Sequence, residues 1–360
     1  MEIYKPYFLQ IVSVIFLVAF FFFDRAKTSR NFSNLILFLL YLLVSSAFIF
    51  RDYQGNIDIP RYLRFYEQNV HFLDIFTSSS AWKADYFFFI LMPLAHLFGL
   101  SGEGYITAQL LLSVGLTFIA INIIFKSSKK WIYLTLFLTI NSSSFYLIHG
   151  NVIRQGLASS LLLLVIASTV TSRQNLYKVL GFFTHKGVAL SFLTRPFKLL
   201  DTIRPVVFIV AALVGYFALI IIILNFLILP EFVQKKVEFY TEFKRASSNS
   251  ILKLLILIIF NFLFFSKLNK SEVFRKTHGL FFIYSVFAVL LFRFDGMFSR
   301  LILYTDIFVP ILTIGFITSF DKSLNRTLAL VGAIICSFLY SIYVFNHKSI
   351  LFNMGEYFVF

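Results

Sequence analysis

The chain has 360 residues, of which 59% are hydrophobic and only 14% carry a charge. A soluble domain averages about 25% charged residues, so this composition excludes a soluble protein and indicates an integral membrane protein. The formal net charge of +15 does not indicate a nucleic-acid partner, because the lysines and arginines lie in short loops between apolar runs.

Apolar runs long enough to cross a hydrocarbon core of about 30 Å as helices recur along the chain. The candidate spans are 7–23, 32–50, 86–100, 105–125, 131–147, 153–171, 176–193, 206–229, 251–265, 279–292, 301–320 and 328–345. The sequence therefore predicts an all-α polytopic membrane protein with about 10 to 13 transmembrane helices, some of them broken or re-entrant. We expect one membrane domain over residues 1–360, with the external loop 51–85 and an amphipathic loop 230–250 as insertions.

Basic clusters at 25–30, 126–130, 173–178, 267–276 and 322–326 indicate cytoplasmic loops. The loops at 51–85, 148–153, 230–250 and 293–300 then face outward. Two loops on the same side of the membrane must be separated by an even number of crossings. Three candidate spans lie between the first two basic clusters and three between 173–178 and 267–276, so we expect one segment in each set, 86–100 and 176–204, to be broken or re-entrant. The first holds Pro93, and the second is interrupted at 184–187.

The loop 51–85 has the densest polar chemistry, and Pro60 is well placed to begin a short helix there. On that helix Tyr62 and Tyr66 share a face with Phe65 and Asn69, while Arg61 and Arg64 share another face. One interpretation is an interfacial helix with its aromatic rings at the headgroups. The other is a lid whose aromatic rings contact sugars and whose arginines contact phosphate. The two are compatible.

Arg154 and Gln155 lie at the head of an apolar run. A charged side chain at or inside a bilayer is expensive, and for an arginine at the centre of a membrane helix the cost is about 3 kcal/mol. Further arginines are predicted on the same outer side: Arg51, Arg61, Arg64, Arg293 and Arg300. Guanidinium groups bind phosphate oxygens through a planar fork of donors. This pattern predicts a site for a lipid diphosphate, whereas Arg51 and Arg300 have the alternative of snorkelling from helix ends.

Transfer of a sugar also needs a base that removes the acceptor proton, and the candidates are Asp58, His149 and His185. Each has a structural alternative. Asp58 is placed to cap a helix, His149 to lie solvated in a loop, and His185 with Lys186 to satisfy broken backbone. The sequence contains no motif for a metal or another cofactor, and Cys336 is its single cysteine.

These residues resemble the EpsG-like branch of the Wzy-type polysaccharide polymerases. The family pattern of Arg, Gly, Asp and Tyr after the second helix is matched by Arg51, Gly55, Asp58 and Tyr62, with Tyr66 as the next aromatic residue. Its Arg-Gln pair is matched by Arg154 and Gln155 with Ala158, its histidine by His185, and its late Arg and Tyr by Arg300 and Tyr304. Lys186 and Gly187 after His185 depart from the family pattern.

The resemblance implies a GT-C-like fold and a metal-independent glycosyltransferase in the bacterial inner membrane. Its donor and acceptor would be oligosaccharides linked to undecaprenyl diphosphate and joined at the periplasmic face, with membrane lipids and a chain-length regulator as further candidate partners. A lipid-linked oligosaccharide ligase would use similar chemistry. A flippase for the same substrate would carry charges through the middle of many helices, and most helix interiors here are uncharged.

Overall fold

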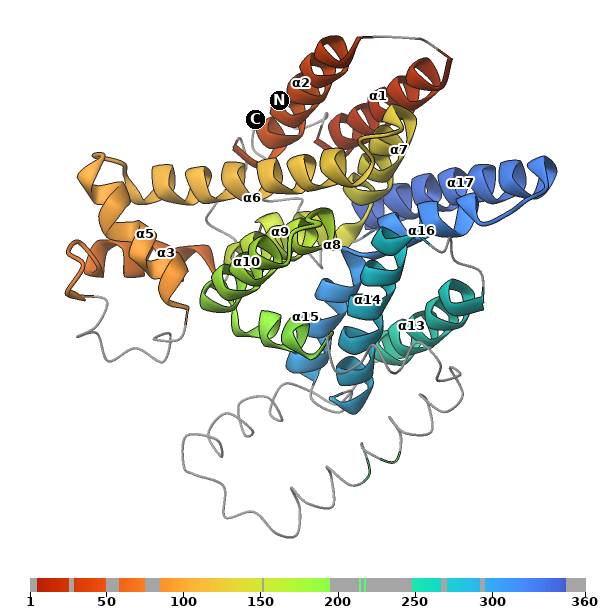
Figure 1. Ribbon diagram of the computed structural model, residues 1–360. Coiled ribbons are helices and arrows are strands. Elements are labelled where there is room, and N and C mark those ends of the chain that lie inside the picture. Colours follow the sequence, from red (N-terminus) through yellow and green to blue (C-terminus); the bar gives the residue numbers. More distant parts are fainter. Residues whose placement is uncertain are drawn as a thin grey trace. The chain divides into compact units, whose positions relative to one another are not determined.

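The computed structural model describes residues 5–25, 29–49, 58–74, 85–150, 152–194, 248–266, 271–291 and 295–347, together with Val214 and Phe217. The regular structure in these ranges is entirely helical, which confirms the all-α prediction (Figure 1). Contacts divide the chain into two compact units, residues 1–189 with 327–360 and residues 190–326, and each is described by itself. The single membrane domain expected from the sequence stays a prediction.

The first unit contains most of the described helices. They are α1 (Lys5–Arg25), α2 (Arg30–Ile49), α3 (Ile59–Gln68), α5 (Tyr86–Leu97), α6 (Gly102–Ile124), α7 (Lys129–Ile140), α8 (Ser143–Gly150), α9 (Ile153–Ala167), α10 (Thr171–Thr184), the start of the 3-10 helix η1 (Lys186–Thr194) and most of α17 (Ser323–His347). Two helices begin with residues that are typical of helix N-termini. Pro60 lies in the first turn of α3, and the Ser101 hydroxyl caps α6 by accepting a hydrogen bond from the Gly104 backbone N–H.

Helix α9 forms the centre of the first unit. Every residue from Ile153 to Ile166 is buried, and the helix packs against α6, α8 and α10. A helix that is enclosed on all sides belongs to the interior of a bundle. Any polar side chain on α9 must therefore find its partners within the protein.

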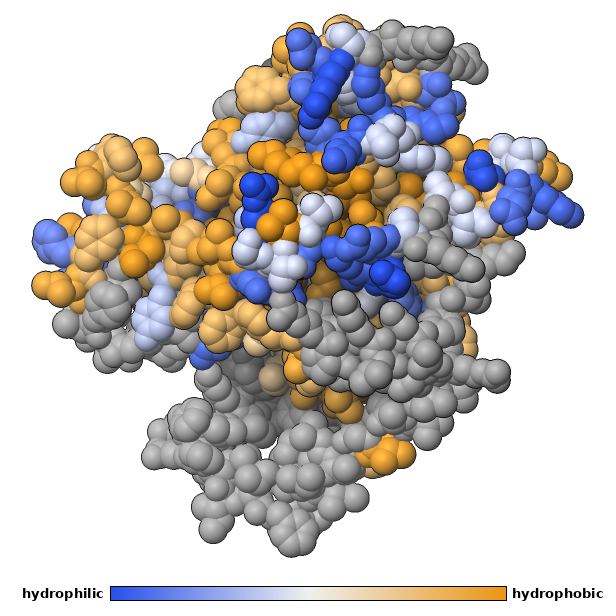
Figure 2. Space-filling view, in the orientation of Figure 1, coloured by the Kyte–Doolittle hydropathy of each residue, from blue (hydrophilic) through white to orange (hydrophobic). Residues whose placement is uncertain are grey.

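Four described helices are long and apolar enough to cross a membrane: α2, α6, α14 (Glu272–Leu290) and the 323–343 part of α17. Two bent pairs raise this to as many as six, namely α7 with α8, and α15 (Asp295–Asp306) with α16 (Val309–Thr318). Large apolar side chains are exposed along α2, α6 and α17, and Figure 2 shows broad apolar areas between separate hydrophilic patches. The chain is a multi-pass membrane protein, and the count of 10 to 13 spans stays a prediction.

The structure corrects some of the expected breaks. Helix α5 continues through Pro93, which has no N–H to donate to the Phe89 carbonyl, and the Tyr105 hydroxyl of α6 donates to the adjacent Phe88 carbonyl at 2.7 Å. The expected break at 184–187 is confirmed, because α10 ends at Thr184 and His185 is extended. The loop expected at 148–153 is wrong in its first part, since residues 148–150 belong to α8. The bend of 77° between α7 and α8 was not expected.

The second unit contains α13 (Ser248–Ser266), α14, α15 and α16. Aromatic rings join these helices: Phe264 and Phe281 have centroids 5.7 Å apart, and Tyr284 and Tyr304 have centroids 5.0 Å apart. The amphipathic loop expected at 230–250 lies almost wholly outside the described residues.

Gly156 allows α8 and α9 to approach each other closely. A Cβ atom placed on Gly156 would lie 2.5 Å from the carbonyl oxygen of Ile148 and 3.1 Å from Nδ1 of His149. The first of these atoms is backbone and cannot rotate away. Only glycine fits at this position without separating the two helices.

We expect Gly156→Ala to destabilise the protein by about 1 to 3 kcal/mol, because overpacking forces α8 and α9 apart. Thermal unfolding of the purified protein in detergent would measure the effect. Gly279→Ala on α14 is the matched control, since a Cβ atom placed on Gly279 would meet nothing within 4 Å, and alanine should there leave stability unchanged or raise it slightly. Equal melting temperatures for the two variants would contradict the close-approach argument.

Candidate functional site

Arg154 lies in the first turn of α9, one residue after Ile153, and is 4% exposed. The first turn of α9 contains no acidic residue of its own. The N-terminus of a helix already carries a partial positive charge, so an arginine placed there needs an anion from another element. The burial of Arg154 makes this need stronger, because a buried charge without a partner is strongly destabilising.

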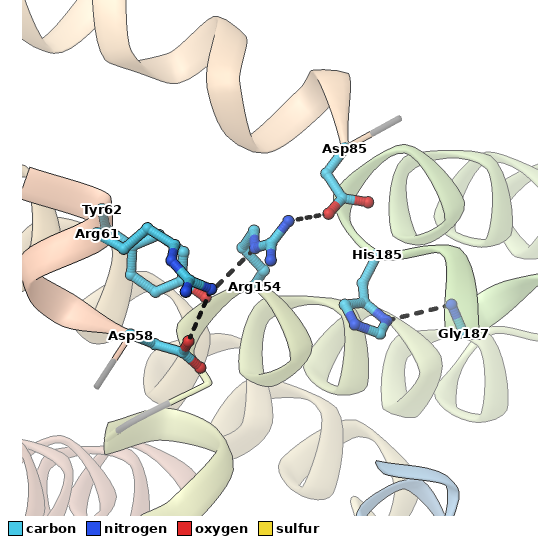
Figure 3. A network of polar contacts seen from close by, with 7 residues as sticks. All are labelled: Asp58, Arg61, Tyr62, Asp85, Arg154, His185 and Gly187. Atoms are coloured by element: carbon cyan, nitrogen blue, oxygen red, sulfur yellow. Dashed lines mark hydrogen bonds and ion pairs between the residues drawn. The ribbon is translucent and has the colours of Figure 1, made fainter. Parts of the chain in front are cut away.

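Asp85 supplies that anion. Its carboxylate accepts a hydrogen bond and forms an ion pair with Nη1 of Arg154 (Figure 3), and the residue is 8% exposed. Asp85 occupies the N-cap position of α5, yet its side chain makes no capping hydrogen bond to that helix. The carboxylate is thus directed at α9 and not at its own helix.

Tyr62 contacts Arg154 from a third element, α3. The Nε–H of Arg154 donates to the Tyr62 hydroxyl at 3.3 Å, and its guanidinium carbon lies 5.5 Å from the centroid of the tyrosine ring. Figure 3 shows Arg154 between Tyr62 and Asp85. The guanidinium therefore joins the starts of α3, α5 and α9.

Tyr66 anchors α3 to the elements beneath it. Its hydroxyl donates to the Leu100 carbonyl, its ring stacks on His96 with centroids 3.8 Å apart, and Tyr105 stacks at 5.3 Å. Burial raises the pKa of the Tyr66 hydroxyl above its ordinary value. The rings of Tyr62 and Tyr66 are both buried against protein, which fixes the position of α3, and their assignment to sugar binding stays a prediction.

Asp58 and the two arginines of α3 lie on its more accessible side. Arg61 and Arg64 are exposed, and Asp58 is half-buried, with a carboxylate oxygen 3.9 Å from Arg61 Nη1. Asp58 occupies the N-cap position but makes no side-chain capping bond. Capping thus does not explain this residue, and its role as a base remains a prediction.

His185 lies at the break between α10 and η1, and its Nδ1 accepts from the Gly187 backbone N–H at 3.1 Å. The ring thereby satisfies backbone exposed by the break, as its structural alternative proposed. Phe183, two residues earlier, contacts Tyr86 with ring centroids 6.5 Å apart. This contact brings the end of α10 to the start of α5, where Asp85 lies.

His149 is not solvated, which corrects the loop interpretation. It is 2% exposed near the end of α8, and its Nδ1 lies 2.7 Å from the hydroxyl of Ser113 on α6. Ser160 of α9 donates to the Ser113 carbonyl at 2.7 Å, and its hydroxyl lies 2.9 Å from that of Thr117. These polar contacts link α6, α8 and α9, the helix that carries Arg154.

The remaining predicted residues fall into three groups. Gln155 is fully buried beside Arg154 on α9. Arg300 and Tyr304 lie on α15 in the second unit, with Arg300 exposed and Tyr304 buried against Tyr284. Arg51 and Arg293 lie outside the described residues, and so does Gly55. Within the ranges that the structure describes, no group of three or more His, Cys, Asp and Glu side chains is placed to hold a metal ion.

Asp85 is the functional candidate that the sequence interpretation missed. It is the single acidic residue between 75 and 102, and it directly precedes an apolar run. That position is equivalent to the position of Arg154 before its own apolar run. Among the predicted spans, 86–100 is the one that directly follows an acidic residue, and this position is the signal that could have identified Asp85.

Comparison with protein families matches residues 35–358 to the EpsG family. The chain belongs to the EpsG family. The match covers the second unit, most of the first unit and all the elements that contact Arg154. EpsG membership indicates a membrane protein of the polysaccharide-polymerase type. A comparison with curated proteins finds no match, and a comparison with solved structures finds none either.

We expect Ser113→Ala to lower the free energy of unfolding by about 1 to 3 kcal/mol, because the buried imidazole of His149 loses a hydrogen-bond partner. Glycan formed per folded molecule should change little if His149 is a structural link between helices. Thermal unfolding and in vivo glycan output, normalised to protein abundance, would measure both. A large loss of output at normal stability would instead make the His149–Ser113 pair part of the reaction.

Proposed function

We propose that this EpsG-family protein is a polysaccharide polymerase of the bacterial inner membrane. It transfers a growing glycan from undecaprenyl diphosphate to a lipid-linked oligosaccharide repeat unit at the outer face. The acceptor hydroxyl attacks the anomeric carbon of the donor sugar. The bond from that carbon to the diphosphate breaks, and undecaprenyl diphosphate leaves with the electron pair.

The observation that carries this proposal is the buried Arg154, held by groups from two other elements. An arginine at the positive end of an enclosed helix is suited to bind an anion that sits at membrane depth. A lipid diphosphate is such an anion, and its negative charge grows as it departs from the sugar. Preorganised donors aimed at that charge stabilise the transition state.

Among the three predicted bases we propose Asp58. Nδ1 of His149 is occupied by Ser113 in a buried environment. Nδ1 of His185 accepts from Gly187, so in the neutral ring Nε2 carries the proton and cannot accept another. Asp58 is a half-buried carboxylate four residues from Tyr62, the residue that contacts Arg154.

Arg154→Lys should abolish polymer formation, because lysine retains the charge but lacks the planar fork. The length profile of surface glycan in a deletion strain rescued with each variant is the measurement. Wild type should restore a ladder of repeat units, and the variant should leave single units. Loss of all attached glycan in the deletion strain would favour a ligase or a flippase, and an unchanged ladder would contradict the proposal.

The ion pair complicates this test, since removing one partner of a buried pair costs about 3 to 5 kcal/mol of stability. The double variant Arg154→Gln with Asp85→Asn removes both charges and avoids that cost. It should accumulate at the membrane and still form no polymer. Arg326→Ala is the control, because Arg326 is an exposed arginine whose guanidinium donates to the Phe320 carbonyl, at 2.7 and 3.2 Å.

Asp58→Asn should slow polymerisation about 100-fold or more, the usual contribution of general base catalysis, while donor binding is retained. An in vitro assay with lipid-linked repeat units would measure the rate. Asp74→Asn is the matched control, because Asp74 lies in the same external loop and accepts from the His71 backbone N–H at 2.7 Å. Equal rates for the two variants would remove Asp58 from the mechanism.

A further inference from the structure

The contact between Asp85 and Arg154 carries an inference about how the proposed site binds and releases its substrate. An aspartate at an N-cap position normally accepts a hydrogen bond from the first turn of its own helix. Asp85 makes no such bond and pairs with Arg154 of α9. The carboxylate therefore neutralises the charge of Arg154 through an ion pair and does not cap α5.

Carboxylate and phosphate oxygens use the same donors of a guanidinium group. A diphosphate that binds Arg154 thus competes with Asp85 for the same fork. Arg154 is 4% exposed and Asp85 is 8% exposed, so little of the guanidinium is accessible while the pair is formed. Binding beside an intact pair would also place the diphosphate next to a second negative charge, which repels it.

We propose that Asp85 is an exchangeable counter-ion, which neutralises Arg154 before substrate binds and is displaced from it by the diphosphate of the lipid-linked substrate. The proposal rests on the proposed function, since it takes the diphosphate as the ligand of Arg154. Tyr62 contacts Nε of Arg154 and stacks its ring near the guanidinium, whereas Asp85 contacts Nη1. Tyr62 can therefore keep the guanidinium in place while Asp85 and the diphosphate exchange.

Exchange has a consequence for turnover. Asp85 occupies Arg154 in most molecules, and only the remaining fraction is free to bind the diphosphate. The apparent affinity for the diphosphate is lower than the intrinsic affinity by that fraction. The same competition favours departure of undecaprenyl diphosphate after the sugar has been transferred. Asp85 is thus a positioning residue that lowers affinity and speeds product release.

The test measures binding of farnesyl diphosphate, a short prenyl diphosphate, to the purified full-length protein in detergent. Asp85→Asn should bind the probe about tenfold more tightly than wild type, equivalent to about 1.4 kcal/mol. In the polymerisation assay the same variant should show a lower KM and a lower kcat. A purely structural role for Asp85 would not lower KM. Affinity equal to or weaker than that of wild type would overturn the exchange.

Two controls separate the possible failures. Asp24→Asn makes the same chemical change in an exposed ion pair, with Lys130 at 2.6 Å, and should leave probe binding unchanged. Arg154→Ala should lose binding. If Arg154→Ala binds the probe as wild type does, the proposed diphosphate site fails. If Arg154→Ala loses binding but Asp85→Asn gains none, the exchange alone fails.

A second measurement applies if Asp85→Asn does not fold. Infrared difference spectra of the wild-type protein, recorded with and without farnesyl diphosphate, should contain a change in a carboxylate band that shifts in Asp85→Glu. This band reports the transfer of the carboxylate away from Arg154. A difference spectrum in which no carboxylate band depends on residue 85 would overturn the proposal without the asparagine variant.

Discussion

The buried positive charge of Arg154 is the constraint around which the first unit is arranged. It lies at the head of α9, a helix enclosed by its neighbours, where the field of the helix itself is positive. A charge in this position is tolerated only if an anion and a hydrogen-bonding group reach it. Asp85 of α5 and Tyr62 of α3 meet both needs.

The positions of the surrounding elements follow from this requirement. Tyr66 joins α3 to the end of α5, because its hydroxyl donates to the Leu100 carbonyl and its ring stacks on His96. Helix α5 continues through Pro93 and presents Asp85 at its N-cap. On the other side of α9, His149, Ser113 and Gly156 hold α8 and α6 close. The guanidinium is thus held by Asp85 and Tyr62 on a helix fixed from its other side, which is the preorganisation that the proposed stabilisation of a departing diphosphate needs.

The same arrangement gives the three candidate bases different surroundings. Two histidines that would be interchangeable in a sequence motif have different surroundings: His149 is a buried link between helices, and His185 completes the backbone of a broken segment. Asp58 is left on the more accessible side of α3 with Arg61. Nδ1 is the contacted nitrogen in both histidines, and the distinction depends on the neighbour: the Ser113 hydroxyl of another helix for His149, and the nearby Gly187 backbone N–H for His185.

Composition and apolar periodicity alone determined the class of this protein, because a chain with few charges and long apolar runs can satisfy its backbone in a membrane only as helices. They also singled out Arg154, since a lone charge at the head of an apolar run is costly wherever the run lies. Tertiary structure decided what neutralises that charge. Asp85 is 69 residues away from Arg154 in the sequence, so their pairing depends on the packing of α5 and α9. The burial of His149, the continuity of α5 through Pro93 and the need for glycine at 156 have the same origin, because each depends on a neighbouring helix whose approach the local sequence does not specify.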